Sequence, residues 1–370
     1  MVKSMHSARI SIALIAAGVV SVSGCSMTIT NGYRFDFKGE KEARQMDIEI
    51  PATVTSLDLR NVHGDIEVLP AADGVAGLQW ELTCWADTQA EATRQIERIQ
   101  LVTSEEGGVF VCEVKLPTEE KEQLRGVKSN MKLRVPASLA VSIRNSHGNI
   151  VASEVACVLE LHGAHGNINA SRLTQPVTLE NSHGDITVDD VVTATIDASH
   201  GDTLVSTVHE IVSVDSSHGH IDVRDVFGSV EVKTSHDDIM LTNVSGLVTA
   251  RNSHGDITGT KLEGGRLDLD TSFGSIKVST LANSIACKNQ HGDIAIVSLS
   301  PELHEVSAKT SFSDLTLTLP IDCQPQLKTS VTFGDIESDF ASSTSVGPAV
   351  ELKVEHGDIR VRRMQAAEQE

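Results

Sequence analysis

Aromatic side chains are scarce in this chain of 370 residues, and cationic side chains are few beside the acidic ones. Phe, Trp and Tyr make up 3% of the sequence, with two Trp and one Tyr, so we do not expect grooves that bind sugars or nucleobases by ring stacking. Lys and Arg number 30 against 51 Asp and Glu, which gives a formal net charge of -21. Phosphate recognition requires clustered cations, and this balance therefore excludes nucleic acid as a partner.

Cysteine is also limited, to six residues, and the sequence holds no Cys-x-x-Cys pair. Neither a zinc site nor a thioredoxin-like redox motif is indicated, and we predict no metal site and no cofactor. Cys84 and Cys112 both lie in strand-like runs of one segment. They are candidates for a disulfide, and two buried free thiols are the alternative.

The longest apolar run is short and lies near the N-terminus, from Ile10 to Val22. It is too short and too rich in small residues for a membrane span, and it is typical of a signal peptide. The following Ser23-Gly24-Cys25 resembles the lipobox of bacterial lipoproteins. That resemblance implies lipid attachment at Cys25, and Ser26 in place of Asp implies sorting to the outer membrane. An ordinary signal peptide with an incidental Cys is the alternative.

A six-residue motif of the type Asn-Ser-His-Gly-Asp-Ile recurs thirteen times. Its third position falls at residues 63, 147, 165, 183, 200, 218, 236, 254, 273, 291, 312, 333 and 356. Apolar residues alternate on both sides of each copy, as in Val177 and Leu179 before the turn and Ile186 and Val188 after it. This pattern predicts two short half-buried strands that meet at a corner. From 147 to 291 the spacing is 17 to 19 residues. A single coil of this length buries too little to be stable alone, so the period predicts an all-β fold, a parallel β-solenoid of about 12 coils.

The gap between the first two copies predicts a small α+β section near the N-terminus. We expect strands over Leu78–Trp85, Leu101–Thr103 and Val109–Leu116, and a helix over Asp87–Ile99 with Asp87 as its N-cap. Such a section could cap the exposed edge of the stack. The predicted divisions are signal peptide 1–24, tether 25–45, first strand repeat 46–69, α+β section 70–135, solenoid repeats 136–362 and polar tail 363–370.

The lipobox, the early Gly-Asp-Ile step, the strand–helix–strand segment, the Val135-Pro136 step and the Gly-Asp-Ile array occur in this order. As a set they resemble the bacterial β-strand-repeat family labelled "putative adhesin", a domain of unknown function, here carried on a lipoprotein. The resemblance covers roughly residues 50–362. It implies a parallel β-solenoid on an envelope-associated protein.

Stacked coils would align the third motif positions in one row along a corner. From the second copy onward this ladder comprises His147, His165, His183, His200, His218, His236, His254, Phe273, His291, Phe312, Phe333 and His356, and His63 stands in the first copy. Phe cannot ligate a metal, yet it shares a flat ring with His, which favours a structural aromatic ladder. Weak binding of Zn, Ni or Cu, and a functional metal or pH role, are the alternatives.

No catalytic motif is present, and we name no catalytic residue. We expect a non-catalytic, lipid-anchored envelope protein that presents an extended solenoid surface, adhesin-like or scaffolding. A periplasmic binding or stress-signalling module and a carbohydrate-active β-helix enzyme are the alternatives. The expected partners are the outer membrane, through acyl chains on Cys25, and an unknown envelope or surface ligand. The sequence does not decide between a periplasmic and a surface-facing orientation.

Overall fold

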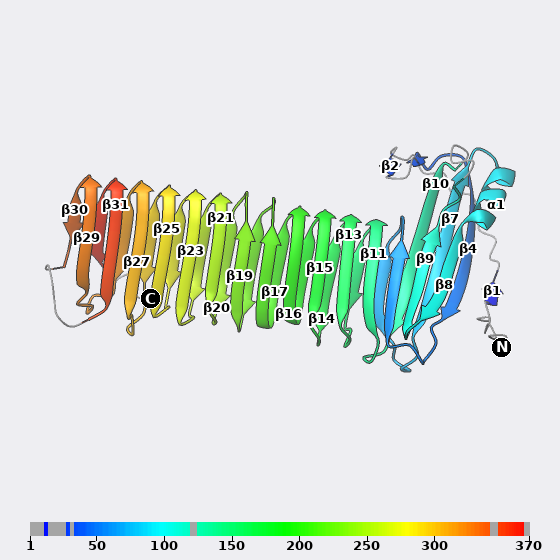
Figure 1. Cartoon of the computed structure of the whole chain (residues 1–370), viewed down its shortest axis with the longest axis horizontal. Helices are drawn as coiled ribbons and strands as arrows, with labels where there is room; N and C mark the ends of the chain where they lie inside the picture. Colours follow the sequence, from blue (N-terminus) through cyan, green and yellow to red (C-terminus); the bar gives the residue numbers. More distant parts are fainter. Residues whose placement is uncertain (1–10, 14–26, 30–32, 119–123, 341–346, 366–370) are drawn as a thin grey trace. The chain divides into compact units, whose positions relative to one another are not determined.

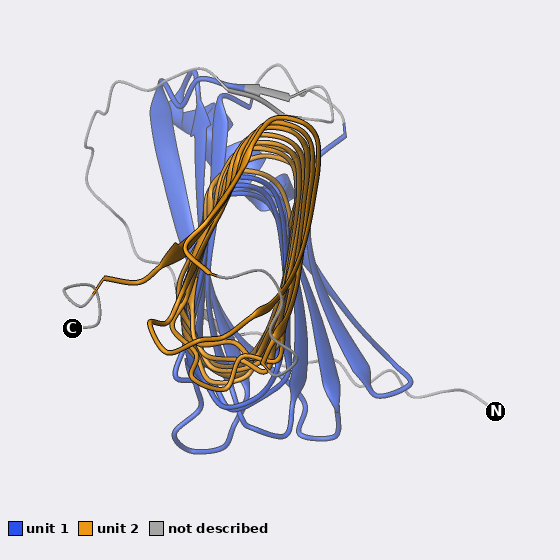
Figure 2. Ribbon diagram, turned by 90° about the vertical axis from the view of Figure 1, so that its left-hand side faces the viewer, with its two compact units in different colours: residues 1–183 blue, residues 184–370 orange. Residues whose placement is uncertain are grey.

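The computed structural model describes residues 11–13, 27–29, 33–118, 124–340 and 347–365. The chain divides into two compact units, residues 1–183 and residues 184–370 (Figure 2).

Unit 1 contains the first solenoid coils together with an α+β section (Figure 1). Its elements are β1 (Ser11–Ala13), β2 (Met27–Ile29), β3 (Tyr33–Phe35), β4 (Glu40–Glu49), β5 (Ser56–Asn61), β6 (Ile66–Pro70), β7 (Gly77–Ala86), α1 (Gln89–Arg98), β8 (Gln100–Glu106), β9 (Val109–Lys115), β10 (Gly126–Val135), β11 (Ala140–His147), β12 (Ile150–Ser153), β13 (Leu159–His165), β14 (Ile168–Leu173) and β15 (Val177–His183). The coil strands pair in parallel, β5 with β11 and β11 with β13, and β6 with β12 and β12 with β14.

Unit 2 contains the remaining coils. Its elements are β16 (Ile186–His200), β17 (Thr203–Ser216), β18 (Ile221–Val226), β19 (Ser229–Thr234), β20 (Ile239–Val244), β21 (Val248–His254), β22 (Ile257–Leu262), β23 (Arg266–Phe273), β24 (Ile276–Thr280), β25 (Ser284–His291), β26 (Ile294–Ser298), β27 (Glu305–Phe312), β28 (Leu315–Leu319), β29 (Gln326–Phe333), β30 (Ile336–Ser338), β31 (Ala349–His356) and β32 (Ile359–Arg363). Strands one coil apart pair in parallel, for example β21 with β23 and β22 with β24.

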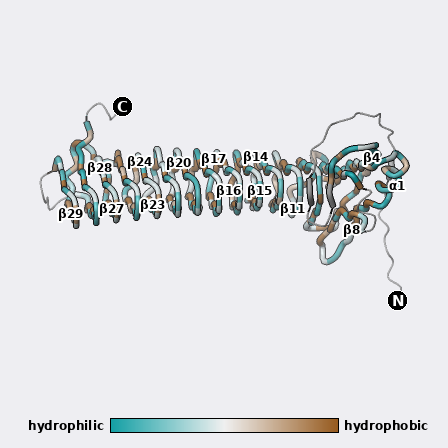
Figure 3. The backbone as a smooth tube through the Cα atoms, turned by 90° about the horizontal axis from the view of Figure 1, so that it is seen from above, coloured by the Kyte–Doolittle hydropathy of each residue, from teal (hydrophilic) through white to brown (hydrophobic). Residues whose placement is uncertain are grey.

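The predicted fold class is confirmed: the chain is almost entirely β-structure and forms a parallel β-solenoid. The two-residue alternation explains it, because one face of every strand lies inside the coil. In β20, Ile239 and Leu241 are fully buried and the intervening Met240 is exposed. Figure 3 shows hydrophobic and hydrophilic residues alternating along the coils of unit 2. Aliphatic side chains one coil apart contact one another in this interior, so each coil shares its buried surface with its neighbours.

The α+β section of unit 1 has the expected order of strand, helix and two strands. Its helix begins one residue later than predicted, since Thr88 rather than Asp87 is the N-cap and its hydroxyl accepts the backbone N–H of Glu91 at 3.2 Å. The sheet also begins earlier than expected. β4 starts at Glu40, inside the predicted tether, because it pairs antiparallel with β7 over ten residues. β1 lies inside the predicted signal peptide and pairs with β4.

The first coil of unit 1 has neighbours on its N-terminal side. β5 pairs with β9, and β6 pairs with β10. β10 also pairs with β7, and β7 pairs with β4. The capping of this edge that the sequence suggested is therefore present in unit 1. Within the part of the chain that the structure describes, no helix is long and apolar enough to cross a membrane.

The coils at the C-terminal end of unit 2 do not stack in sequence order. β31 pairs on one side with β27 and on the other with β29, and β32 lies in the same way between β28 and β30. The last coil of the sequence, β31–β32, therefore lies between the coil of β27–β28 and the coil of β29–β30. The outermost coil of unit 2 is the one formed by β29 and β30.

Candidate binding surface

Nine flat rings stack along one corner of unit 2. Neighbouring centroids lie 4.5–5.2 Å apart and neighbouring planes differ by 2–19°. We call this set the ring row, and in spatial order it comprises His200, His218, His236, His254, Phe273, His291, Phe312, His356 and Phe333. The three Phe rings occupy the same positions as the His rings, so ring shape and stacking set this geometry.

Unit 1 carries a shorter stack of the same kind. His147 lies 4.7 Å from His165, and His165 lies 4.8 Å from His183. His63 ends this stack at 5.7 Å from His147, with the ring of Phe37 at 5.2 Å. Burial, together with the nearby charge of protonated His147, lowers the pKa of His63 from 6.5 to about 4. Burial first, and His165 second, also lower the pKa of His147.

The ring row of unit 2 is exposed, unlike His147, which is buried. Phe273 is 46% exposed and Phe312 50%, and the His rings of the row are exposed as well. Since each ring covers the face of the next, a ligand meets ring edges rather than faces. The His edges carry nitrogen atoms that can donate or accept hydrogen bonds. The row therefore offers polar edge groups at its six histidines, and no stacking platform along its length.

Stacking also determines what the imidazoles can do with a metal ion. The lone pair of an imidazole nitrogen lies in the ring plane, and a zinc ion must lie about 2.0–2.1 Å from each nitrogen that binds it. The planes of His218 and His236 differ by only 2° at a centroid distance of 4.5 Å. Their in-plane lone pairs run side by side and do not converge on one point. Among the described residues no group of three or more His, Cys, Asp or Glu side chains could hold a metal ion.

The glycine of the motif allows each corner to approach the next. Gly201 has a φ of +119°, a value that residues other than glycine rarely adopt. A Cβ atom at this position would lie 2.3 Å from the carbonyl oxygen of Gly184. Where the motif reads His-Asp-Asp, Asp237 takes a φ of +74° in place of glycine, and its Oδ2 accepts the backbone N–H of Gly219 at 2.9 Å.

Carboxylates form a second row beside the corner glycines. The Oδ1 atom of each accepts the backbone N–H at the equivalent position of the next coil, at 2.7–3.2 Å, and these acceptors are Asp185, Asp202, Asp238, Asp256, Asp293, Asp314 and Asp358. Together with Asp335 we call them the carboxylate row. These hydrogen bonds join neighbouring coils and do not close the turn of the same coil.

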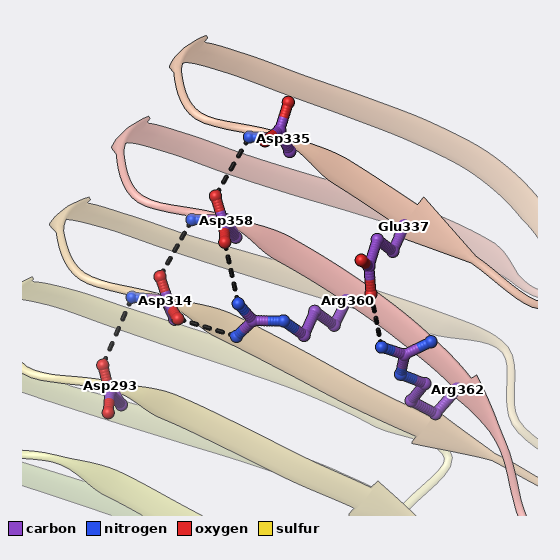
Figure 4. Close-up of polar contacts among 7 residues, drawn as sticks. All are labelled: Asp293, Asp314, Asp335, Glu337, Asp358, Arg360 and Arg362. Carbon is purple, nitrogen blue, oxygen red and sulfur yellow. Dashed lines mark hydrogen bonds and ion pairs between the residues drawn. The ribbon is translucent and has the colours of Figure 1, made fainter.

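Arginine reinforces this row near the C-terminal end of unit 2 (Figure 4). Arg360 donates to Asp314 and to Asp358, at 2.7 Å in each case. The backbone N–H of Asp358 and the guanidinium of Arg360 together hold the pKa of Asp314 below its usual value. Arg362 donates to Glu337 on the neighbouring coil.

The first motif position has a role that the sequence reasoning missed. Asn145 in unit 1 is buried, and its Nδ2 donates to the carbonyl groups of Gly64 at 2.9 Å and Gly148 at 3.0 Å. Asn289 in unit 2 does the same for Gly274 and Gly292. The recurrence of Asn at a position with the parity of buried aliphatic residues was the available signal. A buried amide in that place must have partners, and here it ties two corners together.

Cys84 and Cys112 do not form the disulfide that the sequence suggested as one alternative. Cys84 and Cys112 are both buried free thiols. Cys84 lies on β7 opposite Glu42 and Val127, whereas Cys112 lies on β9 opposite Leu59 and Thr103, so the two share no partner strand. The structure therefore agrees with the other alternative, two buried free thiols. Burial raises the pKa of each to about 12. The predicted lipid attachment at Cys25 lies outside the described residues.

Several solved structures are similar to this chain at low identity. A protein described as a "putative adhesin" from Parabacteroides merdae is 13% identical over 88% of this chain and 98% of that chain, with a TM-score of 0.26. A "putative lipid binding protein" from Parabacteroides distasonis is 12% identical over 73% and 97%, with a TM-score of 0.31. A "putative cell adhesion protein" from Clostridium sporogenes is 8% identical over 88% and 100%, with a TM-score of 0.22. No curated protein matches the chain.

A family model gives a stronger relation. The model for Toastrack DUF4097 matches residues 30–257 and 227–370, two overlapping stretches that together run from residue 30 to the last residue given. This result confirms the resemblance to a bacterial strand-repeat domain of unknown function that the motifs indicated. The chain belongs to the Toastrack DUF4097 family.

Proposed function

We propose that this protein is a lipid-anchored, non-catalytic component of the bacterial envelope that binds a polymer along its ring row and carboxylate row. The observation that carries the proposal is the exposed, repeating corner of unit 2. There, ring edges recur every 4.5–5.2 Å beside half-buried or exposed carboxylates. A surface that repeats once per coil suits a ligand that also repeats, and it lacks the local break in pattern that an enzyme site requires.

The chemistry of the corner defines the class of ligand. Imidazole nitrogens and carboxylate oxygens form hydrogen bonds with hydroxyl and amide groups. The carboxylates repel phosphate-rich polymers, in agreement with the net charge of -21. We therefore infer a neutral or amine-bearing envelope polymer rich in hydroxyl and amide groups. Many weak contacts in register would bind it through avidity rather than through one deep pocket.

Membrane attachment is proposed from the sequence alone. Acyl chains on Cys25 would hold the acidic body at the outer membrane, where its own surface charge gives no attraction to anionic lipid. The full-length chain, expressed in a Gram-negative host with an alkyne analogue of palmitate, should carry the label in the outer-membrane fraction. Cys25→Ser should lose both the label and the membrane fractionation. A labelled Cys25→Ser chain, or an unlabelled parent, would contradict the anchor.

Binding is tested by co-sedimentation of the mature protein with purified peptidoglycan sacculi and, separately, with outer-membrane vesicles. The double variant His218→Glu/His236→Glu places two charges in the ring row. It should weaken binding by about tenfold or more. The matched control, His209→Glu/His304→Glu, makes the same charge change at two exposed histidines outside both rows and should bind like the parent. Equal binding by both variants would show that the ring row is not the contact.

Protease treatment of intact cells decides the orientation. Digestion of the folded chain at its loops would place the solenoid on the cell surface, as an adhesin-like role requires. Complete protection until the outer membrane is opened would place it in the periplasm, where the same surface would serve as a scaffold or a binding module.

A further inference from the structure

In the part of the chain that the structure describes, the outermost coil of unit 2, formed by β29 and β30, has no neighbouring strand on its outer side. Among the described residues, β29 pairs only with β31 and β30 only with β32. Each edge strand in a sheet presents backbone N–H and C=O groups that can pair with another chain. The coil therefore ends in two open edges, one on each wall of the flattened loop that Figure 2 shows for unit 2.

Side chains that are buried in the other coils are exposed in this one. Ile336 is 46% exposed, whereas Ile359 and Leu315, its equivalents in the two preceding coils, are fully buried. Phe333 is the last ring of the row, is 63% exposed, and stacks on one face only, against His356 at 4.8 Å. Asp335 likewise ends the carboxylate row. Its N–H bonds to Asp358, and no described residue donates to its own carboxylate from the outer side.

We propose that a second copy of this chain docks on the β29–β30 coil and forms a two-fold dimer. An extended peptide could pair with one open edge, but the coil has two, on opposite walls. A second β29–β30 coil has the same two edges at the same separation, so it can meet both at once. Stacking onto the first coil of unit 1 is blocked, since β9 and β10 already pair with β5 and β6 there.

The sequence of β29 allows a self-complementary register. In a two-fold pair the strands run antiparallel, and centring on Ser330 places each residue opposite one of the same parity. Leu327 then faces Phe333 of the second copy, and Thr329 faces Val331. The only charged residue of the strand, Lys328, faces Thr332, and in its own chain it is paired with Glu351 at 2.8 Å. No like charges are therefore opposed across β29.

The association is measured by sedimentation equilibrium of residues 25–370 carrying Cys25→Ser, which removes any acyl-driven association. We expect a monomer–dimer equilibrium with a dissociation constant below about 200 µM. Phe333→Glu should raise the dimer dissociation constant by at least about tenfold. Phe227→Glu is the matched control, because Phe227 is 60% exposed on another corner of unit 2, and it should dimerise like the parent. A monomeric parent at about 200 µM, or equal effects of the two variants, would overturn the proposal.

The register is tested by cross-linking in a background that also carries Cys323→Ser. With Cys25 and Cys323 both replaced, the four cysteines that remain are buried. Ser330→Cys should form an intermolecular disulfide under mild oxidation, since the two-fold axis places residue 330 opposite itself. Thr332→Cys lies in the same exposed strand but away from the axis, and it should remain monomeric on a non-reducing gel. Equal cross-linking at both positions, or none at Ser330→Cys, would contradict this arrangement.

Discussion

The ring row predicts that a histidine of unit 2 can be replaced by phenylalanine but not by alanine. His236 is the clearest position, because its ring stacks on His218 at 4.5 Å and on His254 at 5.2 Å. Its hydrogen bond from Nδ1 to the carbonyl of Ser217 is long, at 3.4 Å, and contributes little. Stacking, rather than hydrogen bonding, should therefore set the effect of a substitution.

The magnitude follows from the number of stacks. An aromatic pair contributes about 0.5–1.5 kcal/mol beyond its buried area, so removing two pairs costs about 1–3 kcal/mol. The rings are exposed, which places His236→Ala near the lower end, at about 1–2 kcal/mol. His236→Phe retains both stacks and should lie within about 0.5 kcal/mol of the parent. His220→Ala removes a histidine from the neighbouring coil that stacks on no described ring, and it serves as the control.

Urea unfolding followed by circular dichroism measures these differences, and hydrogen exchange shows whether they are confined to coils near position 236. Exchange is needed because stacked repeats can unfold in parts, so one unfolding free energy does not describe the whole array. If His236→Ala were as stable as the parent, the stacks would contribute nothing. If His236→Phe were as unstable as His236→Ala, ring stacking would not be the reason for the recurring residue.

Three further predictions concern other parts of the molecule. Gly201→Ala should destabilise the protein by more than about 3 kcal/mol in urea unfolding, because its Cβ would lie 2.3 Å from a backbone oxygen and its φ is +119°. Gly265→Ala is the control and should change stability little, because a Cβ at that position would have no heavy atom within 4 Å. The pKa of His63 is lowered from 6.5 to about 4, so the unfolded chain binds the proton first, and stability should be full above pH 6.5 and fall toward pH 4. His63→Phe should reduce that loss in unfolding curves measured across this range, and an unchanged loss would assign it to other groups. With thiol pKa values of about 12, Cys84 and Cys112 should resist iodoacetamide at about pH 8 in the folded protein and react in urea, as peptide mass spectrometry would show; alkylation of the folded protein would contradict their burial.

The repeat made the fold predictable because its period and its alternation act locally. Any segment such as Val177–Val188 specifies two strands and a corner from its own residues, and stacking follows because one coil cannot bury its apolar face alone. The order of the last coils was not predictable in this way. The segments at 305–319, 326–338 and 349–363 each satisfy the same pattern. Which of them is outermost depends on contacts between segments, and sequence spacing does not record those contacts.

The candidate surface was predictable in part for the same reason. Recurrence of His and Phe at one position indicated a ladder, and the structure places the rings face to face. Whether their faces or their edges meet the solvent depends on side-chain rotation, which the pattern does not specify. The hydrogen-bond partner of the motif carboxylates does not follow from the pattern, because the same residue can bond within its own turn or to the next coil. For Asp314 the partner is the N–H of Asp358, forty-four residues away in the sequence.

The ring row maintains the corner by stacking, and we propose that its nitrogen-bearing edges bind an envelope polymer. The variant that carries His200→Phe, His218→Phe, His236→Phe and His254→Phe separates these two roles. Its unfolding midpoint should match that of the parent, because every stack is retained, while its co-sedimentation with the sacculi or vesicles that bind the parent should be lost. Unchanged binding by this folded variant would contradict the central claim.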